Sequence, residues 1–331
     1  MTPEIEEHCH RILKNPRIQN RVVILCEGGT DDQEGRLSPQ SFQKNDRSPD
    51  SNFYQACIPR WWRNKQKTPF FVNSGDRSKV LDTFFGLLDL HRLSPNLSYL
   101  SPNRLFALVD LDIQSKTLQS EDIYKNHSVY GSIEKIFEAT YSQGKFQDDL
   151  NMNNHIFITG LVHKEAYFLL LKLQDTFKQE QAQFEGTALN LADLYPKIAN
   201  GITTDEDLRS SQNFSRIQTR LKHYPYLDSN TLEDLQQSWL DRYDCCYDDH
   251  SDLVTSLFLI CKAKPYWKKL ESNDSRTPEQ FQDQVAIGKI AKFYKDRGDR
   301  FQPQDNRHCT SPVDHIPCLF RAIYRIAYET K

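Results

Sequence analysis

The sequence lacks the features that mark membrane and secreted proteins. No apolar run approaches the roughly 18 residues of a membrane-spanning helix, and the polar, acidic segment from Met1 to His10 does not resemble a signal peptide. The eight Cys contain no Cys-x-x-Cys pair, and without a secretion signal they are typical of reduced thiols rather than of a disulfide framework. We therefore expect a cytoplasmic protein that makes no contact with a membrane.

A basic surplus is also missing, since 42 Lys and Arg stand against 45 Asp and Glu, for a net charge of −3. Dedicated nucleic-acid binders usually carry more basic than acidic residues, so a tight, sequence-specific binder is disfavoured. A nuclease remains open, because its metal ion neutralises phosphate locally. The chain has neither a Gly-x-x-x-x-Gly-Lys-Ser/Thr run nor a Gly-x-Ser-x-Gly run, which disfavours an ATP-binding P-loop and a serine hydrolase of the elbow type.

What the sequence does contain is two short apolar runs that each lead into carboxylates. Val22–Cys26 is followed by Glu27, and Leu105–Val109 is followed by Asp110 and Asp112. Neither run alternates between apolar and polar residues, which is typical of strands buried on both faces of a parallel sheet. Functional groups collect at the carboxyl ends of such strands, and the two Asp share one side because strand side chains alternate. We therefore expect three carboxylates at one edge of a sheet.

Three convergent carboxylates repel one another unless a cation binds them. Mg²⁺ and Mn²⁺ prefer oxygen ligands, so Glu27, Asp110 and Asp112 are predicted to hold one such ion. Glu27 has a second interpretation, as an acid that interacts with the N-terminus of a helix following Gly28 and Gly29.

These motifs resemble the TOPRIM domain, the metal-binding fold of topoisomerases, primases and OLD-type nucleases. The matching segments are Glu27-Gly28, Asp110-x-Asp112, Glu27-Gly28-Gly29-Thr30-Asp31, Asn73–Val80, His155–Thr159 and His163–Phe168. The last is similar to a helix start in the nuclease subunit of PARIS-type phage-defence systems. The resemblance spans residues 18–175, and the 83 residues from Glu27 to Asp110 (110 − 27) exceed the spacing in compact TOPRIM domains.

The resemblance implies a metal-dependent nuclease that cuts DNA or RNA in defence against phage or mobile elements. Asp31 and Glu165 are then candidates for a second ion, and Lys262 and Lys264 for stabilising charge at the scissile phosphate. The implied partners are the nucleic acid, an ATPase protein and further copies of the chain. Two other interpretations stay open: an inactive TOPRIM-like module that binds nucleic acid or a partner, and a primase-type enzyme that uses nucleoside triphosphates.

The predicted fold class is α/β, with a TOPRIM-like, mostly parallel sheet flanked by helices and a mainly helical C-terminal region. A chain of 331 residues holds one large or two medium domains. We place a metal-binding domain at 1–175 and a helical region at 176–331, with the option that it packs on the first domain. Residues 33–52 are polar and aperiodic, which predicts a mobile inserted loop. Strands are expected within 21–32, 68–73, 104–112 and 155–160.

Cap and proline signals predict where several helices begin. Ser78 is expected to cap a helix that runs to Leu93, and Ser132 a helix that runs to Tyr141. Thr277 and Pro278 are typical of a further helix N-terminus. The final helix, Pro312–Tyr328, is expected to be interrupted near Pro317.

Two segments interleave basic and aromatic residues, Arg60–Lys67 and Lys262–Lys269. Each has two interpretations, because such side chains either stack on bases and bind phosphate or anchor the core beneath a charged surface. The closest approach to a zinc site is the group His308, Cys309, His315 and Cys318. It lacks the paired spacing of structural zinc sites and is more typical of buried thiols and surface histidines.

Overall fold

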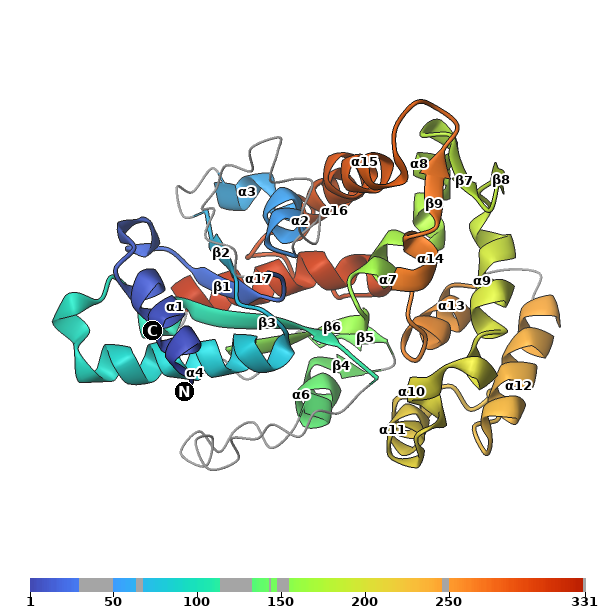
Figure 1. The fold of residues 1–331 in the computed structure, drawn as a ribbon, viewed down its shortest axis with the longest axis horizontal. Helices are drawn as coiled ribbons and strands as arrows, with labels where there is room; N and C mark the ends of the chain where they lie inside the picture. Colours follow the sequence, from blue (N-terminus) through green and yellow to red (C-terminus); the bar gives the residue numbers. More distant parts are fainter. Residues whose placement is uncertain are drawn as a thin grey trace.

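The computed structural model describes residues 1–29, 50–63, 68–113, 133–142, 144–147, 155–245 and 250–329. Its centre is a four-stranded sheet with the order β2-β1-β3-β6, in which each neighbouring pair is parallel (Figure 1). The strands are β1 (Val23–Cys26), β2 (Phe70–Asn73), β3 (Leu105–Leu111) and β6 (Ile156–Val162). All four lie where the sequence predicts strands, so the α/β class with a parallel sheet is confirmed.

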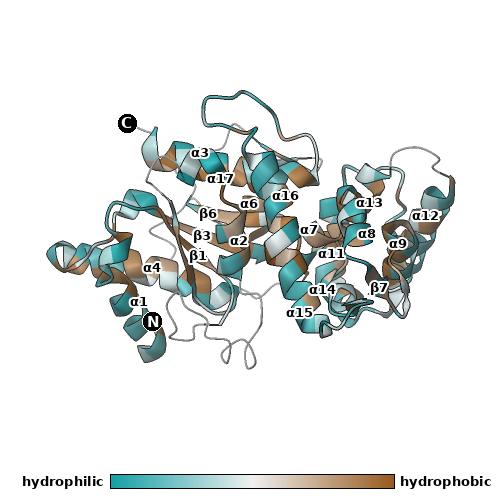
Figure 2. Cartoon of the chain, turned by 90° about the horizontal axis from the view of Figure 1, so that it is seen from above, coloured by the Kyte–Doolittle hydropathy of each residue, from teal (hydrophilic) through white to brown (hydrophobic). Residues whose placement is uncertain are grey.

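Burial on both faces explains why these strands lack alternation. Every residue of β1 and β6 is buried, as is every residue of β3 except Asp110. Helix α4 (Arg77–Leu93) packs on β1 and β3, and α1 (Pro3–Leu13) packs on α4. Helix α2 (Asp50–Cys57) packs on β1 and β2 from the other side. The strands are therefore hydrophobic between helices whose outer faces are hydrophilic (Figure 2).

The strand order reverses next to β1. The chain passes from β1 to β2 on one side and then crosses through α4 to β3 on the other side of β1. Ligands bind to open α/β sheets outside the carboxyl ends of the strands at such a reversal. The carboxyl ends of β1 and β3 are the segments that carry Glu27 and Asp110.

The predicted inserted loop over 33–52 is wrong at its C-terminal end. Asp50, Ser51 and Asn52 form the first turn of α2, and the side chains of Asp50 and Ser51 are buried. Polar composition concealed this turn, since the helix shows its apolar pattern only from Phe53 onward. Residues 30–49, which hold the remainder of the predicted loop, lie outside the described residues.

Two predicted helix details also differ. Asp76, rather than Ser78, caps α4, because its side chain accepts a hydrogen bond from the Lys79 backbone N–H at 3.1 Å. Helix α17 (His315–Tyr328) runs through Pro317 without interruption. Pro317 lies in the first helical turn, where backbone N–H groups have no partner within the helix and a missing N–H costs nothing. The helix N-terminus predicted at Thr277 and Pro278 is confirmed, and Thr277 also forms a capping box with Gln280. Ser132 lies outside the described residues.

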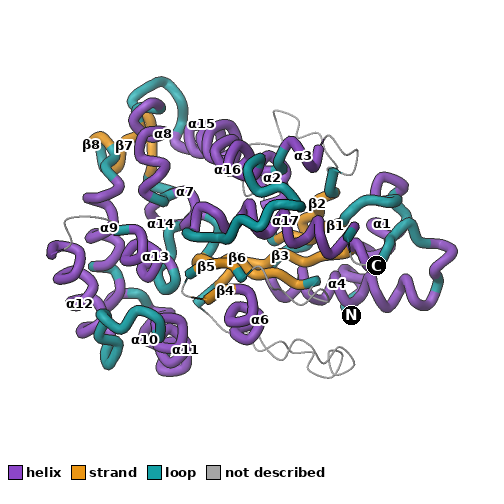
Figure 3. The backbone as a smooth tube through the Cα atoms, turned by 180° about the vertical axis from the view of Figure 1, so that it is seen from behind, coloured by secondary structure: helices purple, strands orange, loops and turns teal. Residues whose placement is uncertain are grey.

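The second half of the chain is mainly helical, as predicted, and also contains a small sheet that the sequence did not predict. The sheet has the order β8-β7-β9 and is antiparallel throughout. Figure 3 shows β7 and β8 beside α8, away from the central sheet. Its strands are β7 (Ala182–Phe184), β8 (Thr187–Ala188) and β9 (Leu270–Ser272), and a separate hairpin joins β4 (Tyr141–Ser142) to β5 (Lys145–Phe146). The remaining helices are α3 (Arg60–Arg63), α6 (Ile133–Thr140), α7 (Glu165–Phe168), α8 (Gln174–Gln179), α9 (Leu191–Ala199), α10 (Glu206–Arg209), α11 (Ser211–Leu221), α12 (Leu232–Cys245), α13 (Ser251–Phe258), α14 (Lys264–Trp267), α15 (Pro278–Asp283) and α16 (Ala291–Gly298).

The C-terminal helices return to the central sheet. A π-helical segment, Gln284–Ile290, joins α15 to α16, and both this segment and α16 pack on α2. Helix α17 packs on β6, and its Tyr324 ring contacts the rings of Trp61 and Trp62 edge-on. The first half therefore shares its core with the last helices of the chain. None of the described helices combines the length and the apolar character that a membrane crossing requires.

Candidate functional site at the carboxyl ends of β1, β3 and β6

Glu27 and Asp110 meet at the carboxyl ends of two adjacent parallel strands. The Glu27 Oε1 atom accepts a hydrogen bond from the Asp110 backbone N–H at 2.8 Å. Both carboxylates line one pocket together with Asp112, as the alternation of strand side chains predicts. The other residues that line this pocket are Asp76, Arg77, Ser78 and His163. The three predicted carboxylates are thus close together at one edge of the sheet.

A pair of glycines ties together the two loops that border this pocket. Gly28 and Gly75 exchange backbone hydrogen bonds of 2.9 and 2.8 Å. Both have positive φ angles, 132° and 91°, which glycine adopts without the steric cost that a Cβ atom adds. Glu27 therefore directly precedes a rigid connection to the loop that leads into α4.

Strand β6 has two extra residues where it pairs with β3 beside Asp110, since Val109 pairs with Ile158 and Leu111 pairs with Val162. The pairing of β3 with β6 is irregular between Val109 and Leu111. The Leu111 N–H donates to the Thr159 hydroxyl oxygen at 2.7 Å, and that hydroxyl donates to the Leu161 carbonyl at 2.9 Å. Irregularities of this kind are common beside active sites, where they change the direction of a side chain.

His163 lines the pocket from the end of β6. Its backbone has a positive φ of 61°, a conformation that is uncommon and costly for a residue with a side chain. The Nε2 atom lies 3.7 Å from Asp112 Oδ1, and the buried Nδ1 atom has no hydrogen-bond partner among the described residues. The fold therefore holds this imidazole beside Asp112 at the cost of backbone strain.

Behind the pocket lies a buried ion pair, in which the Lys164 ammonium donates to Asp50 Oδ1. Only 10% of the Lys164 side chain and 8% of the Asp50 side chain are exposed. Burial by itself lowers the pKa of Lys164, but the charges of Asp50, Glu165 and Asp110 raise it well above its usual range. Lys164 is therefore a permanent cation within the group of carboxylates.

The carboxylates of the site resist ionisation. Burial raises the pKa of Glu27 to about 7, against the hydrogen bond from the Asp110 N–H, which lowers it. Burial, followed by the charges of Asp50 and Glu27, raises the pKa of Asp110 well above its ordinary value. Burial also raises the pKa of Asp50, while Lys164 opposes that shift. Burial at this edge of the sheet thus makes the ionised forms of Glu27, Asp110 and Asp50 costly.

Of the two predicted ligands of a second ion, Glu165 alone lies within the described residues. Asp31 lies outside the described residues. Glu165 is buried at the start of α7 and is not among the residues that line the pocket, although its charge acts on Lys164 and Asp110.

The two predicted lysines are placed differently from one another. Lys262 pairs with Asp207, and its ammonium lies 4.0 Å from Asp205, so it belongs to the helical region. Lys264 begins α14, which packs on α7, and its charge lowers the pKa of Asp50 against the larger effect of burial. Lys264 alone of the two acts electrostatically on the carboxylate group.

Sequence reasoning missed Asp50, which it assigned to a loop, and gave no role to His163 or Lys164. The local signal for Asp50 was an acidic residue three positions before Phe53, where the apolar pattern begins. His163 and Lys164 follow the apolar run of β6 in the same way that Glu27 follows β1, and the rule that strand ends carry function applies equally to them.

The chemistry of the pocket fits a hard divalent cation. Glu27, Asp110 and Asp112 offer carboxylate oxygens, the ligands that Mg²⁺ and Mn²⁺ prefer. Among the described residues, no three His, Cys, Asp or Glu are grouped as a ready-made metal site. Mg²⁺ is commonly bound through one or two carboxylates, with water and substrate phosphate completing its shell. The same absence, within the described ranges, offers no support for zinc at Cys309 and Cys318.

The basic and aromatic segments are largely structural. Trp62 is fully buried and contacts the rings of Phe320 and Tyr324, while residues 64–67 of that segment lie outside the described residues. Trp267 is buried against Phe168 and Phe177. The aromatic side chains of both segments therefore anchor the core.

Comparison of the chain with protein-family models, with curated proteins and with solved structures found no match. The residues and geometry of this pocket are therefore what indicates the function of the protein.

Proposed function

We propose that this protein is a divalent-metal-dependent nuclease that hydrolyses phosphodiester bonds in DNA or RNA. The observation that carries the proposal is the contact between Glu27 and Asp110 at adjacent strand ends, in a pocket that Asp112 and His163 also line. The resemblance to TOPRIM nucleases extends the proposal to a role in defence against phage or mobile elements, with an ATPase partner and assembly into oligomers.

The charge of the pocket supports a cation-dependent reaction. Carboxylates repel the anionic phosphates of nucleic acid, and Glu27 and Asp110 are already costly to ionise because of burial. A divalent cation removes both difficulties, because it stabilises the ionised carboxylates and attracts phosphate. When bound, Mg²⁺ or Mn²⁺ lowers the pKa of a water molecule and stabilises charge on the phosphoryl oxygens.

The side chains of the chain have separate roles in this proposal. Glu27, Asp110 and Asp112 bind the ion. Lys164 favours the ionised form of Asp50 against the effect of burial and holds its side chain by an ion pair. His163 is the proposed proton carrier, since its imidazole lines the pocket and lies beside Asp112.

A cleavage assay tests the proposal. Supercoiled plasmid, single-stranded DNA and total RNA are incubated with the purified protein in Mg²⁺, in Mn²⁺ and in EDTA. Asp110→Asn keeps the size of the side chain but removes a charged ligand, and Glu185→Gln is the control, because Glu185 is an exposed carboxylate of the small sheet region. We expect metal-dependent cutting by the wild type and the control and loss of cutting by Asp110→Asn. Cutting by Asp110→Asn at the wild-type rate would contradict the proposal.

The alternative is a TOPRIM-like binding module without chemistry. It is favoured by the absence, in the part of the chain that the structure describes, of a three-residue metal group. Titration with Mn²⁺ separates the two functions, since a binding module has no need of an ion at Glu27 and Asp110. A primase-type enzyme is distinguished by its requirement for nucleoside triphosphates.

A further inference from the structure

Arg220 connects the helical region to the candidate site. It lies on α11, and only 1% of its side chain is exposed. One guanidinium nitrogen, Nη2, donates to the backbone carbonyl of Asp112 at 2.7 Å, and Nη1 donates to the backbone carbonyl of Leu259 at 3.3 Å. A residue from the second half of the chain therefore binds directly to the main chain of the Asp-x-Asp motif.

Asp112 lies at a point where the sheet no longer fixes the backbone. Strand β3 ends at Leu111, whose carbonyl accepts the hydrogen bond from the His163 N–H at 3.1 Å. The Asp112 carbonyl lies one residue beyond that bond, and Arg220 supplies a donor there from outside the sheet. The direction of the Asp112 carboxylate depends on the orientation of this peptide.

Glu134 of α6 orients the guanidinium. Its two carboxylate oxygens lie 2.8 Å from Arg220 Nη2 and 3.4 Å from Arg220 Nε. A two-point contact of this kind fixes the plane of the guanidinium, which a single contact does not. Arg220 therefore has little freedom to turn away from the Asp112 carbonyl.

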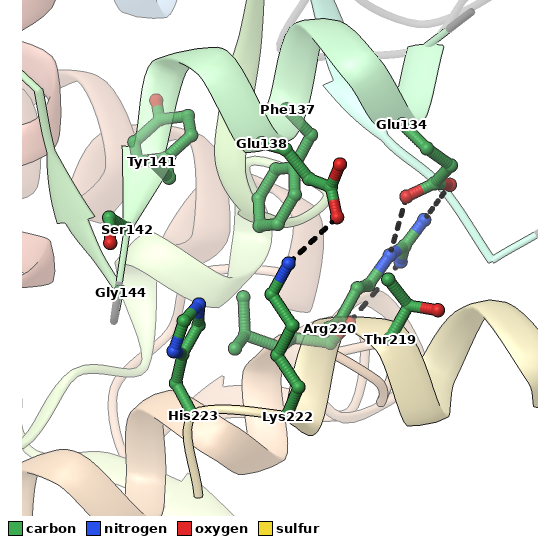
Figure 4. A pocket seen from close by; sticks show the side chains of 11 residues that line it. Glu134, Phe137, Glu138, Tyr141, Ser142, Gly144, Thr219, Arg220, Lys222 and His223 are labelled. Atoms are coloured by element: carbon green, nitrogen blue, oxygen red, sulfur yellow. Dashed lines mark hydrogen bonds and ion pairs between the residues drawn. The ribbon is translucent and has the colours of Figure 1, made fainter.

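Figure 4 shows the contact between Glu134 and Arg220 in a second pocket. This pocket is lined by residues of α6, the β4–β5 hairpin and α11. Glu134 and Arg220 lie on one side of it. Lys222 and Glu138 form another ion pair across the same pocket, at 2.9 Å. That second pair is half exposed and does not reach Asp112, so it is a natural comparison for the Arg220 contact.

We propose that Arg220 is a positioning residue of the nuclease site, one that fixes the Asp112 backbone so that the Asp112 carboxylate faces the ion held by Glu27 and Asp110. This inference rests on the proposed function. The helical region then completes the metal site, and a change at Arg220 weakens ion binding although Arg220 touches neither the ion nor the substrate.

The test measures Mn²⁺ binding by titration calorimetry and cleavage as kcat and KM, both on the full chain. Arg220→Lys keeps the positive charge. A single ammonium group, however, cannot reach Asp112, Leu259 and Glu134 at once, as the separate nitrogens of the guanidinium do. Loss of an outer contact to a metal ligand typically weakens metal binding or activity by about 10- to 100-fold. For Arg220→Lys we expect Mn²⁺ to bind at least ~10-fold more weakly than to the wild type. We also expect a lower kcat and an unchanged KM. Lys222→Met should match the wild type in Mn²⁺ affinity, kcat and KM.

Thermal unfolding shows whether each variant is folded. If Arg220→Lys does not fold, Glu134→Gln replaces it, since that change keeps Arg220 and loosens its orientation, and weaker Mn²⁺ binding is again expected. Wild-type affinity in a folded Arg220→Lys or Glu134→Gln protein would overturn the inference while leaving the nuclease proposal intact. A wild-type protein that binds no Mn²⁺ and cuts nothing would overturn both.

Discussion

Glu27 is a carboxylate that the fold stabilises in its protonated form. Its pKa rises from the ordinary 4.5 to about 7, chiefly through burial. Below about pH 4.5 the folded and unfolded chains both hold the proton, so the stability is unaffected. Between pH 4.5 and 7 the unfolded chain releases the proton first, and the free energy of unfolding falls as the pH rises. Above pH 7 the free energy of unfolding stays below its value at pH 4.5 by a constant amount, on the order of a few kcal/mol.

Glu27→Gln should therefore stabilise the protein in EDTA at pH 8 and have little effect at pH 4.5. The amide oxygen still accepts the hydrogen bond from the Asp110 N–H, and no charge remains to be buried. Urea unfolding at both pH values measures the difference. The same change at Glu233, an exposed glutamate in the first turn of α12, is the control. Equal stability of Glu27→Gln and wild type at pH 8 would contradict burial as the cause of the raised pKa.

Lys164→Met should destabilise the protein by about 3–5 kcal/mol, because it leaves the buried Asp50 carboxylate without its cation. Adding Asp50→Asn removes the unpaired charge and should recover part of the loss. Chemical denaturation measures both variants. Lys197→Met provides the comparison, since its pair with Glu185 is 51% exposed on each side and such pairs contribute about 1 kcal/mol or less. A Lys164→Met loss as small as that of Lys197→Met would show that the ion pair is unimportant.

Hydrogen bonds to backbone groups hold the loops and strand ends that carry the site. Gly28 and Gly75 connect the ends of β1 and β2, and Thr159 satisfies the N–H that the irregular pairing of β3 with β6 leaves free. These hydrogen bonds are short, so a substitution that strains the backbone at one of them should displace the neighbouring carboxylate.

Gly28→Ala should cost about 1–3 kcal/mol, because it places a side chain at a positive φ. An added Cβ would also lie 3.0 Å from Asn73 Oδ1. We expect lower cleavage as well, since Glu27 directly precedes the strained residue. Gly29→Ala is the matched control, because a Cβ there meets nothing within 4 Å among the described residues. Unfolding midpoints and cleavage rates compare the two, and equal values would rule out a conformational requirement at Gly28.

The two ends of the chain share one core. Trp62 and Phe71 from the first half contact Phe320 of α17, and α16 packs on α2. The hydrophobic cluster of buried residues extends from Ile5 to Ile326. A boundary near residue 175 consequently separates segments in sequence that the packing joins in space.

A fragment of residues 1–175 should fail to form a stable fold, because removal of α16 and α17 exposes the aromatic surface that they cover. The wild-type chain, by contrast, should unfold in a single cooperative transition. Circular dichroism and the dispersion of amide signals in NMR spectra test both statements. A fragment with native-like dispersion and a cooperative melt would establish 1–175 as an independent domain.

Local sequence patterns were sufficient for the strands and for the carboxylates that follow them. Burial on both faces requires continuous apolar runs, so β1, β3 and β6 can be predicted from the sequence. Because these strands are parallel, Glu27, Asp110 and Asp112 lie at one edge of the sheet. The first residues of helices were harder to predict. The first turn of α2 is polar, and its Asp50 is buried only because Lys164 lies beside it.

The sequence by itself determined the α/β class, the four strands and the three carboxylates at the sheet edge, because each depends on residues that are neighbours along the chain. Tertiary structure alone decided which partners reach those carboxylates. Asp50 and Lys164 are 114 residues apart in sequence, and Asp112 and Arg220 are 108 apart. No local sequence pattern encodes such a pairing, since the fold brings the two residues together only after the helices have packed on the sheet.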